Sequence, residues 1–175
     1  MEAVILRLAT LPDLPALLSL VRRVVPLMHA DGIFQWDDTY PNEQVFGADI
    51  HAGQLWIADP EDGVVAGVAA ITTEQYPEYA QVGWDIDEPA VVVHRLAVDP
   101  AYRGAGIAIA LMRQAEVVAQ ETGISVLRVD TNTKNAATQR LFPKLGYTLG
   151  GEFSLDFRPG LRFVCYEKRL APVPK

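Results

Sequence analysis

The sequence predicts an α+β protein of one domain, with helices covering a mixed β-sheet. Its 175 residues, 50% of them hydrophobic and 21% charged, suit one domain with a complete core. The apolar patterns follow the order strand, helix, helix, three strands, helix, strand, helix, two strands. The strand–helix–strand segment in the middle is a crossover unit, so its two strands are expected to be parallel. We expect the domain to span residues 1–170 and residues 171–175 to form a loose tail.

The first elements are indicated by alternation and then by helical spacing. Residues 5–9 alternate as a strand does, and the segment Thr10-Leu11-Pro12-Asp13 begins a helix with a proline near its first position. A loop over 32–42 and a short helix near 42–52 follow. The first helix is expected to bury an apolar stripe of Leu14, Leu17, Leu18, Val21, Val24, Val25 and Met28.

Two antiparallel strands, a long loop and a central strand come next. The strands are expected over 55–58 and 64–72, on either side of the turn at 59–63. Residues 74–90 are polar but carry two tyrosines and a tryptophan, which favours a functional loop over a disordered linker. Residues 91–98 form a strongly apolar strand, which we place at the centre of the sheet.

The C-terminal part supplies the crossover helix and a final strand pair. A helix over 104–121 is followed by a buried strand at 126–129 and a short helix near 135–145. Residues 147–157 and 161–169 are expected to pair antiparallel. The buried face of the crossover helix is predicted to carry Ile107, Leu111, Ala115 and Val118.

Several classes of site are disfavoured by the cysteines, histidines and apolar runs. Cys165 is the only cysteine, so no internal disulfide can form, and we expect it in the core. His29, His51 and His94 are too scattered for a zinc pattern, and we expect no metal. Neither a signal-like leader nor an apolar run of about 18 residues occurs, which predicts a cytoplasmic protein without membrane contact.

The charge is divided between the two parts of the chain. The net charge of −7 argues against nucleic-acid binding, which depends on clustered Lys and Arg. No Lys or Arg lies between Arg23 and Arg95, a stretch that holds thirteen carboxylates. From Arg95 onward, twelve Lys or Arg face seven acidic residues. This asymmetry favours an anionic cofactor for the second part and a cationic substrate for the first.

A glycine-containing turn follows the central strand. Gly104 and Gly106 remove side chains just where a helix begins, so that backbone N–H groups can converge on an anion at the positive helix end. A Walker A site is excluded, since no Gly-Lys-Ser/Thr tripeptide occurs. A dinucleotide-binding turn is disfavoured because Ile109 takes the place of its third glycine, although Asp130 lies near where a ribose-binding acid would be.

These residues resemble the GNAT superfamily of acyl-coenzyme A dependent N-acetyltransferases. The first match is Arg103-x-x-Gly106-x-Ala108 after the strand His94-Arg95-Leu96-Ala97-Val98, and the second is Asn135-Ala136-Ala137 followed by Leu141-Phe142-Pro143-Lys144-Leu145-Gly146-Tyr147. The resemblance covers nearly the whole chain in element order. It implies the fold of that superfamily, in which two central parallel strands splay apart around the thioester of acetyl-coenzyme A.

The resemblance also implies how this cosubstrate is held. The backbone amides of Arg103, Gly104, Ala105, Gly106, Ile107 and Ala108 would bind the pyrophosphate. The segment Leu96-Ala97-Val98 would pair with the pantetheine arm as an added strand. Asn135 would donate a hydrogen bond to that arm.

Direct attack of an amine on the thioester is the mechanism that the resemblance implies, and each of its roles has candidates. The backbone N–H of Val98 would stabilise the oxyanion. His94 is a candidate base, or else a core histidine, with Asp85, Asp87 and Glu88 as alternatives that act through water. The usual tyrosine acid is replaced by Phe142, so Tyr147, water or an unaided thiolate must take its place.

Aromatic residues among the carboxylates point to a cationic acceptor. We expect Phe34, Trp36, Tyr40 and Trp84 to meet the substrate through cation–π contacts, or else Trp36 and Trp84 to cover loop ends on the core. The predicted activity is acetylation of a small cationic primary amine. A protein or peptide acceptor, and an acyl-coenzyme A binding module with weak catalysis, are the alternatives. The sequence leaves open whether the protein forms a homodimer.

Overall fold

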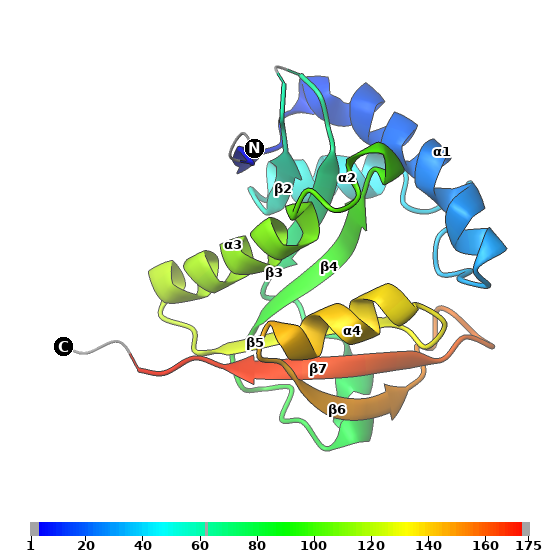
Figure 1. Ribbon diagram of the computed structural model, residues 1–175. Helices are drawn as coiled ribbons and strands as arrows, with labels where there is room; N and C mark the ends of the chain where they lie inside the picture. The colour runs from blue at the N-terminus through cyan, green and yellow to red at the C-terminus, as the bar shows by residue number, and fades with distance from the viewer. Residues whose placement is uncertain (1–3, 62, 173–175) are drawn as a thin grey trace. The chain divides into compact units, whose positions relative to one another are not determined.

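The computed structural model describes residues 4–61 and 63–172 (Figure 1). The chain divides into two compact units, which we take in turn. Unit 1 holds the chain up to Ile71 together with His94–Gln114, and unit 2 holds Thr72–Val93 together with the chain from Ala115 onward. Part of the predicted loose tail, residues 173–175, lies outside the described residues.

Unit 1 is built on antiparallel strands. Strands β1 (Leu6–Leu8), β2 (Leu55–Ala58) and β3 (Gly67–Thr72) pair in that order, which confirms the predicted antiparallel neighbours. The third strand begins three residues later than the apolar pattern indicated. Strand β4 (Val91–Val98) is the next in the sheet and contributes its second half, from His94, to this unit.

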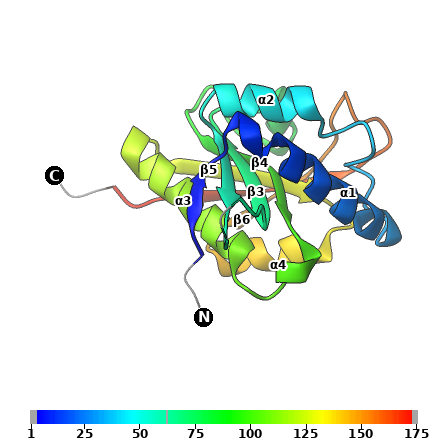
Figure 2. The same ribbon diagram turned by 90° about the horizontal axis from the view of Figure 1, so that it is seen from above.

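Two helices cover these strands and enclose a core. Helix α1 (Leu14–Ala30) and helix α2 (Glu43–His51) lie beside β2 and β3 (Figure 2). Asn42 caps α2 by accepting a hydrogen bond from the Val45 N–H at 2.9 Å. The core that they share with the strands is formed by Leu17, Leu20, Val21, Val24, Phe46, Leu55, Ile57 and Val68.

Helix α3 (Ile107–Thr122) begins in unit 1 and ends in unit 2. It starts at Ile107 and not at the predicted position 104, because both glycines before it have positive φ. Ile107, Leu111 and Ala115 are buried as expected. The fourth position on that face is Ala119 and not Val118, since an exact spacing of four residues continues the row.

Unit 2 contains the parallel pair and the C-terminal strands. Strand β5 (Val126–Asn132) pairs in parallel with β4 over Val91–Val93, which confirms the crossover. Strands β6 (Thr148–Phe153) and β7 (Phe163–Arg169) are antiparallel as predicted. β7 lies between β5 and β6, so that the full hydrogen-bonded order is β1-β2-β3-β4-β5-β7-β6. The predicted α+β class with a mixed sheet is therefore confirmed.

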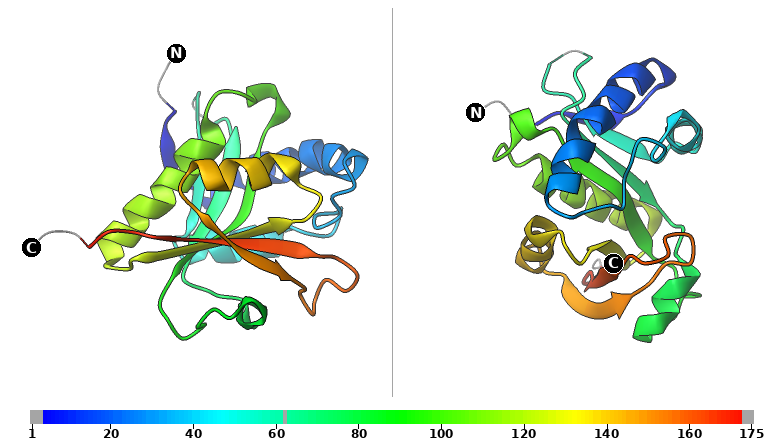
Figure 3. Two further views of the ribbon diagram at one scale, coloured as in Figure 1. Left: turned by 60° about the horizontal axis from the view of Figure 1, so that its bottom comes forward. Right: turned by 90° about the vertical axis from the view of Figure 1, so that its right-hand side faces the viewer.

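Different elements pack on the two faces of β5. Helix α4 (Ala136–Lys144) lies along β5 and β7 (Figure 3), and Thr138 on it is hydrogen-bonded through its hydroxyl to Thr131 at 2.7 Å. Val126, Arg128 and Asp130 point to the opposite face by strand alternation. That face is covered by the 74–90 loop, which contains a 3₁₀ helix over Pro77–Val82. Within the described part of the chain, no helix is long and apolar enough to span a bilayer.

Candidate functional site

The 103–108 loop has the geometry of an anion site. Gly104 and Gly106 adopt φ values of 80° and 77°, and both are exposed. A Cβ at either position would meet nothing within 4 Å, so the space above the loop is open. The first turn of α3 contains no acidic residue, so its N–H groups face no carboxylate of their own. A phosphate can therefore approach this backbone closely.

Asp99, just before the loop, is prevented from repelling an anion. Its carboxylate accepts hydrogen bonds from Arg23 of α1 at 2.6 and 3.1 Å and from the Ala101 N–H at 3.0 Å. Asp99 is buried, and Arg23 neutralises its charge. No local pattern in the sequence indicates this pair, because its members are 76 residues apart.

Gly67 allows α3 to approach the strands. A Cβ at Gly67 would lie 2.5 Å from Ile107 Cγ2 and 3.3 Å from the Ala97 carbonyl oxygen. Any larger residue would push the start of α3 away from β4, on which the 103–108 loop depends. A single glycine inside a strand is a signal for such a close approach, and Gly67 is the residue that carries it here.

Strand β4 has an irregular backbone at Arg95, which we call the bulge. Arg95 has φ = 54°, a left-handed conformation that is uncommon for a residue with a side chain. The regular alternation of a strand is therefore interrupted between His94 and Leu96, so alternation does not place His94 on the same face as Leu96 and Val98. His94 itself is buried, with 8% of its surface exposed.

Beyond the bulge, the strand directs alternate N–H groups to opposite edges. The Asp99 N–H donates to the Ala66 carbonyl at 2.8 Å, on the side of β3. Because successive peptide groups of a strand point in opposite directions, the Val98 N–H points away from β3, and so does that of Leu96. Among the described residues the parallel ladder of β4 with β5 has three residue pairs, which end at Val93.

Arg95 is held by two groups of unit 1. Its guanidinium donates to both carboxylate oxygens of Asp49 in α2, each at 2.7 Å, and to the Tyr40 hydroxyl at 3.2 Å. Burial opposes the charge of the guanidinium, but the hydrogen bonds with Asp49 and Tyr40 outweigh it and raise the pKa of Arg95. The bidentate pair is well shielded from solvent.

The 32–42 loop is ordered by its own polar groups. Asp37 accepts hydrogen bonds from the Thr39 and Tyr40 N–H groups at 2.8 and 3.0 Å. Of the aromatic residues predicted to meet the substrate, Phe34 is exposed, Tyr40 is half-buried and Trp36 is buried in the core. The position of Trp36 favours the covering role over substrate contact.

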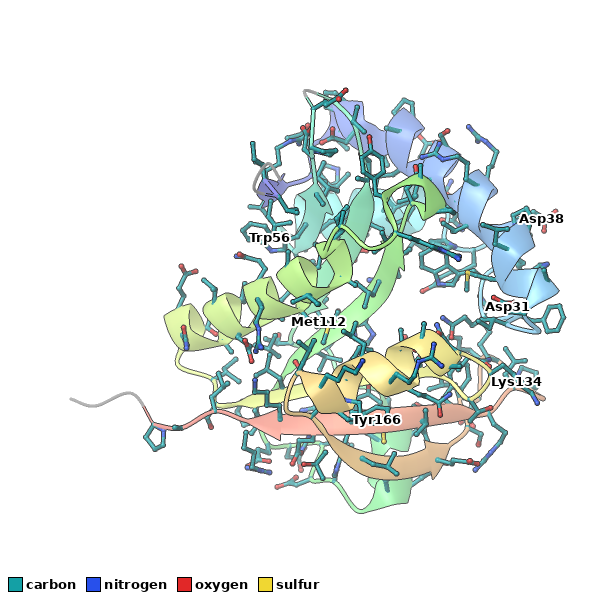
Figure 4. The ribbon with its side chains drawn as sticks, in the orientation of Figure 1. Asp31, Asp38, Trp56, Met112, Lys134 and Tyr166 are labelled. Atoms are coloured by element: carbon teal, nitrogen blue, oxygen red, sulfur yellow. The ribbon has the colours of Figure 1, made fainter. Side chains whose placement is uncertain are left out.

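Exposed carboxylates accompany this loop. Asp31 and Asp38 are both exposed, and Figure 4 shows them beside the C-terminal half of α1. Phe34 lies nearby, with its ring 5.1 Å from that of His29. The loop thus presents an apolar ring and the charge of Asp38 to solvent, and Asp31 adds a second negative charge directly before it.

The 74–90 loop is occupied by contacts within unit 2. Arg128 is fully buried and donates to Glu167 at 2.9 Å, to the Gln75 side chain at 2.5 Å and to the Asp85 carbonyl at 2.9 Å. The Trp84 ring stacks on its guanidinium at 4.8 Å. Trp84 therefore already has a cation, and its position favours the structural of its two predicted roles.

A partly buried carboxylate lies beneath the same loop. The Tyr79 hydroxyl donates to Asp130 Oδ2 at 2.6 Å, and Asp130 faces Cys165 across β5 and β7. Burial raises the pKa of Asp130 to about 6, although the Tyr79 hydrogen bond opposes this. Burial, with a smaller contribution from Asp130, raises the pKa of the Cys165 thiol to about 12. Cys165 is thus a core residue, as predicted, and stays a thiol at neutral pH.

The second motif forms the start and end of α4. Asn135 caps this helix, since its side-chain oxygen accepts from the Thr138 N–H at 3.2 Å, and its amide nitrogen is the group that it can offer to a ligand. Phe142 is 1% exposed and packs against Tyr147 and Tyr166; Figure 4 labels Tyr166 on β7. Tyr147 is also buried.

Metal ligands are not grouped in the part of the chain that the structure describes. There, no three or more His, Cys, Asp or Glu side chains are arranged to hold an ion.

Comparison with known proteins agrees with the two motifs. The sequence profile of the acetyltransferase (GNAT) family matches residues 21–147. Human N-acetyltransferase 8B is 29% identical over 98 residues, which are 56% of this chain and 40% of that protein. The match thus spans less than half of the human protein.

Solved structures share the fold over nearly the whole chain. A GNAT-family acetyltransferase from Streptococcus agalactiae has a TM-score of 0.80 and 27% identity, covering 97% of each chain. The protein yncA of Salmonella typhimurium, solved with its cofactor acetyl-CoA, has a TM-score of 0.69 and 21% identity, covering 99% of this chain and 98% of the other. Together with the profile match, which covers well over half of the sequence, this establishes that the chain belongs to the acetyltransferase (GNAT) family.

Proposed function

We propose that this acetyltransferase transfers the acetyl group of acetyl-coenzyme A to a small cationic primary amine. As a member of the GNAT family it takes acetyl-coenzyme A as its cosubstrate. The observation that carries the assignment is the 103–108 loop, in which two exposed glycines with positive φ open a helix that has no acid in its first turn. The backbone N–H groups from Arg103 to Ala108 would bind the pyrophosphate there.

The bulged strand would receive the rest of the cosubstrate. The N–H groups of Leu96 and Val98 point away from β3, so an extended pantetheine arm can pair with Leu96-Ala97-Val98 as an added strand. The Val98 N–H would then stabilise the oxyanion of the thioester carbonyl. Asn135 is proposed, from the family resemblance, as a further hydrogen-bond donor to the arm.

The reaction would proceed by direct attack without an acyl-enzyme. The ammonium group loses a proton to a base, the free nitrogen attacks the thioester carbon, the C–S bond breaks, and the thiolate takes up a second proton from nitrogen through a donor or water. The high pKa of Cys165 fits the absence of a cysteine nucleophile. His94 remains the proposed base and Tyr147 the proposed acid, since Phe142 has no proton to donate.

The acceptor would meet the 32–42 loop. Phe34 and Tyr40 offer rings for cation–π contact, and Asp31 and Asp38 add exposed negative charge. Trp36 and Trp84 are also predicted to meet the substrate, but Trp36 is buried and Trp84, in the 74–90 loop, stacks on Arg128, so they support the acceptor proposal less. The Lys side chain or N-terminus of a peptide has the same chemistry and is the second candidate.

Initial-rate measurements over a panel of acceptors test this proposal. The panel contains diamines, primary amines, Lys-containing peptides and amino acids with acidic side chains, all at one acetyl-coenzyme A concentration. We expect the highest kcat/KM for cationic primary amines without a neighbouring carboxylate. Preference for an anionic acceptor would contradict the proposed substrate class, and acetyl-coenzyme A binding without turnover of any amine would favour a binding module instead.

A further inference from the structure

Arg95 links three parts of unit 1, two of which have separate roles in the proposed function. It lies at the bulge of β4, directly before Leu96–Val98. Its bidentate partner Asp49 belongs to α2, and its third partner Tyr40 belongs to the 32–42 loop. One side chain therefore connects the strand that would pair with pantetheine to the loop that would meet the acceptor.

The link is unusually well defined. Both bonds to Asp49 are 2.7 Å long, and the side chains are only 13% and 5% exposed. Such a bidentate pair fixes the orientation of the guanidinium plane, which a lysine could not do. Removing either partner would leave the other charge largely shielded from solvent without its counter-ion, which is unfavourable.

The backbone of Arg95 needs this support. For residues with a side chain the left-handed region costs roughly 1–2 kcal/mol, and a regular strand conformation is the alternative. If Arg95 relaxed to that alternative, the residues after it would turn to the other face and edge of the strand. The N–H groups of Leu96 and Val98 would then no longer point away from β3.

We propose that Arg95 is a positioning residue, which through Asp49 and Tyr40 holds the β4 bulge in the conformation that binds acetyl-coenzyme A. This inference rests on the proposed function, because it concerns the same strand. It adds that the contacts of α2 and the 32–42 loop set the affinity for the cosubstrate. Acceptor binding at that loop and acetyl-coenzyme A binding at the strand are then energetically coupled.

The test compares acetyl-coenzyme A dissociation constants, measured by calorimetry without acceptor, for Arg95→Gln, Arg95→Gly and Asp49→Asn. Arg95→Gln and Asp49→Asn should each weaken binding roughly tenfold. The Arg95–Asp49 pair then no longer offsets the free-energy cost of the left-handed backbone conformation at residue 95. Arg95→Gly should weaken it less than about threefold, because glycine adopts the left-handed conformation without a steric penalty. Arg22→Gln is the matched control, since Arg22 is an exposed arginine of α1, and its dissociation constant should stay within about twofold of the wild type.

The outcomes separate this inference from the proposed function. If the wild-type protein fails to bind acetyl-coenzyme A, the proposed function fails. If the wild type binds, and folded Arg95→Gln and Asp49→Asn bind equally well, only the role of Arg95 is overturned. If Arg95→Gly and Arg95→Gln weakened acetyl-coenzyme A binding equally, the backbone conformation at the bulge would not be the cause of the weaker binding. Circular dichroism at the titration temperature verifies folding, and Asp49→Asn decides the matter if Arg95→Gln does not fold.

Discussion

The 32–42 loop and the 74–90 loop have similar compositions and different uses. Both combine aromatic residues with carboxylates, and both were predicted to meet a cationic substrate. In the 74–90 loop the Trp84 ring, the Glu88 carboxylate and the Asp85 carbonyl contact Arg128, a cation supplied by the chain itself. In the 32–42 loop Phe34 and Asp38 remain exposed, as does Asp31 directly before it. Composition alone therefore cannot distinguish a binding loop from one that packs on a buried charge.

Ion pairs within the protein likewise account for part of the charge asymmetry of the sequence. Part of it is neutralised within the protein, since Arg95 pairs with Asp49, while Arg128 and Arg169 pair with Glu88. These arginines come from the basic part of the sequence and their partners from the acidic stretch. A smaller excess of negative charge is then left to recognise an acceptor.

Replacement of Arg128 by leucine should have the largest effect. It leaves the carboxylate of Glu167 and the polar groups of the 74–90 loop without their buried partner, and should lower the free energy of unfolding by about 3–5 kcal/mol. Urea denaturation measures this change. Arg169→Gln, which removes the exposed arginine that also contacts Glu88, is the control and should cost less than about 1 kcal/mol. Equal effects would mean that the 74–90 loop does not depend on Arg128.

Alanine substitutions at Trp84 and Phe34 compare the loops directly. Trp84→Ala removes packing against Tyr79 and the stack on Arg128, and should cost about 3 kcal/mol. Phe34→Ala should change stability by less than about 0.5 kcal/mol, because Phe34 is exposed, and should instead raise the acceptor KM. Thermal unfolding and acceptor kinetics give the two readouts. If Phe34→Ala lost stability and Trp84→Ala raised the acceptor KM, the 74–90 loop would be the one that meets the acceptor.

The pH dependence of stability should report the carboxylate beneath the 74–90 loop. Asp130 has a pKa of about 6 in the folded protein against an ordinary value of 3.8, so the folded state binds more protons between these values. Its favourable contribution is complete below pH 4 and is lost as the pH rises through 6. Relative to Asp130→Asn, the wild type should lose about 2 kcal/mol over this range. Parallel stability curves from pH 4 to 7 would show that Asp130 does not titrate there.

The smallest expected effect concerns the exposed acids of the 32–42 region. The double substitution Asp31→Asn, Asp38→Asn should raise the KM for a cationic amine roughly threefold to tenfold at low salt, with stability nearly unchanged. Glu61→Gln, which removes an exposed charge elsewhere in unit 1, is the control. Kinetics at two salt concentrations measure the effect, which should shrink at high salt. A KM that is independent of these carboxylates would argue against a cationic acceptor at this loop.

Most of the fold follows from local patterns in the sequence. Within the described residues, apolar patterns and turn signals predict each α-helix and each strand of the sheet, with shifts of a few residues at their ends. The position of β7 between β5 and β6 does not follow, since a hairpin is equally consistent with β6 next to β5. The bulge at Arg95 does not follow either, because arginine carries no signal for a positive φ.

The site was predictable where it depends on consecutive residues. Gly104 and Gly106 could be identified because spacing alone relates them to the helix start. Asp49–Arg95, Arg23–Asp99 and the contacts of Arg128 join residues that are 39 or more positions apart, and the sequence contains no local sign of them. The same limit applies to Trp36 and Trp84, whose surroundings are formed by distant residues.

Acetyl-coenzyme A binding to wild type and to Gly106→Val, measured by calorimetry, tests the account most directly. Valine at φ = 77° is strongly disfavoured and would cover the N–H groups of the 103–108 loop. Gly160→Val is the matched control, since Gly160 also has positive φ and open surroundings but lies in the turn between β6 and β7. We predict saturable one-to-one binding by the wild type and by Gly160→Val, and a loss of at least tenfold in affinity for Gly106→Val. Unchanged affinity in Gly106→Val, or no binding by the wild type, would contradict the assignment of the 103–108 loop as the acetyl-coenzyme A site.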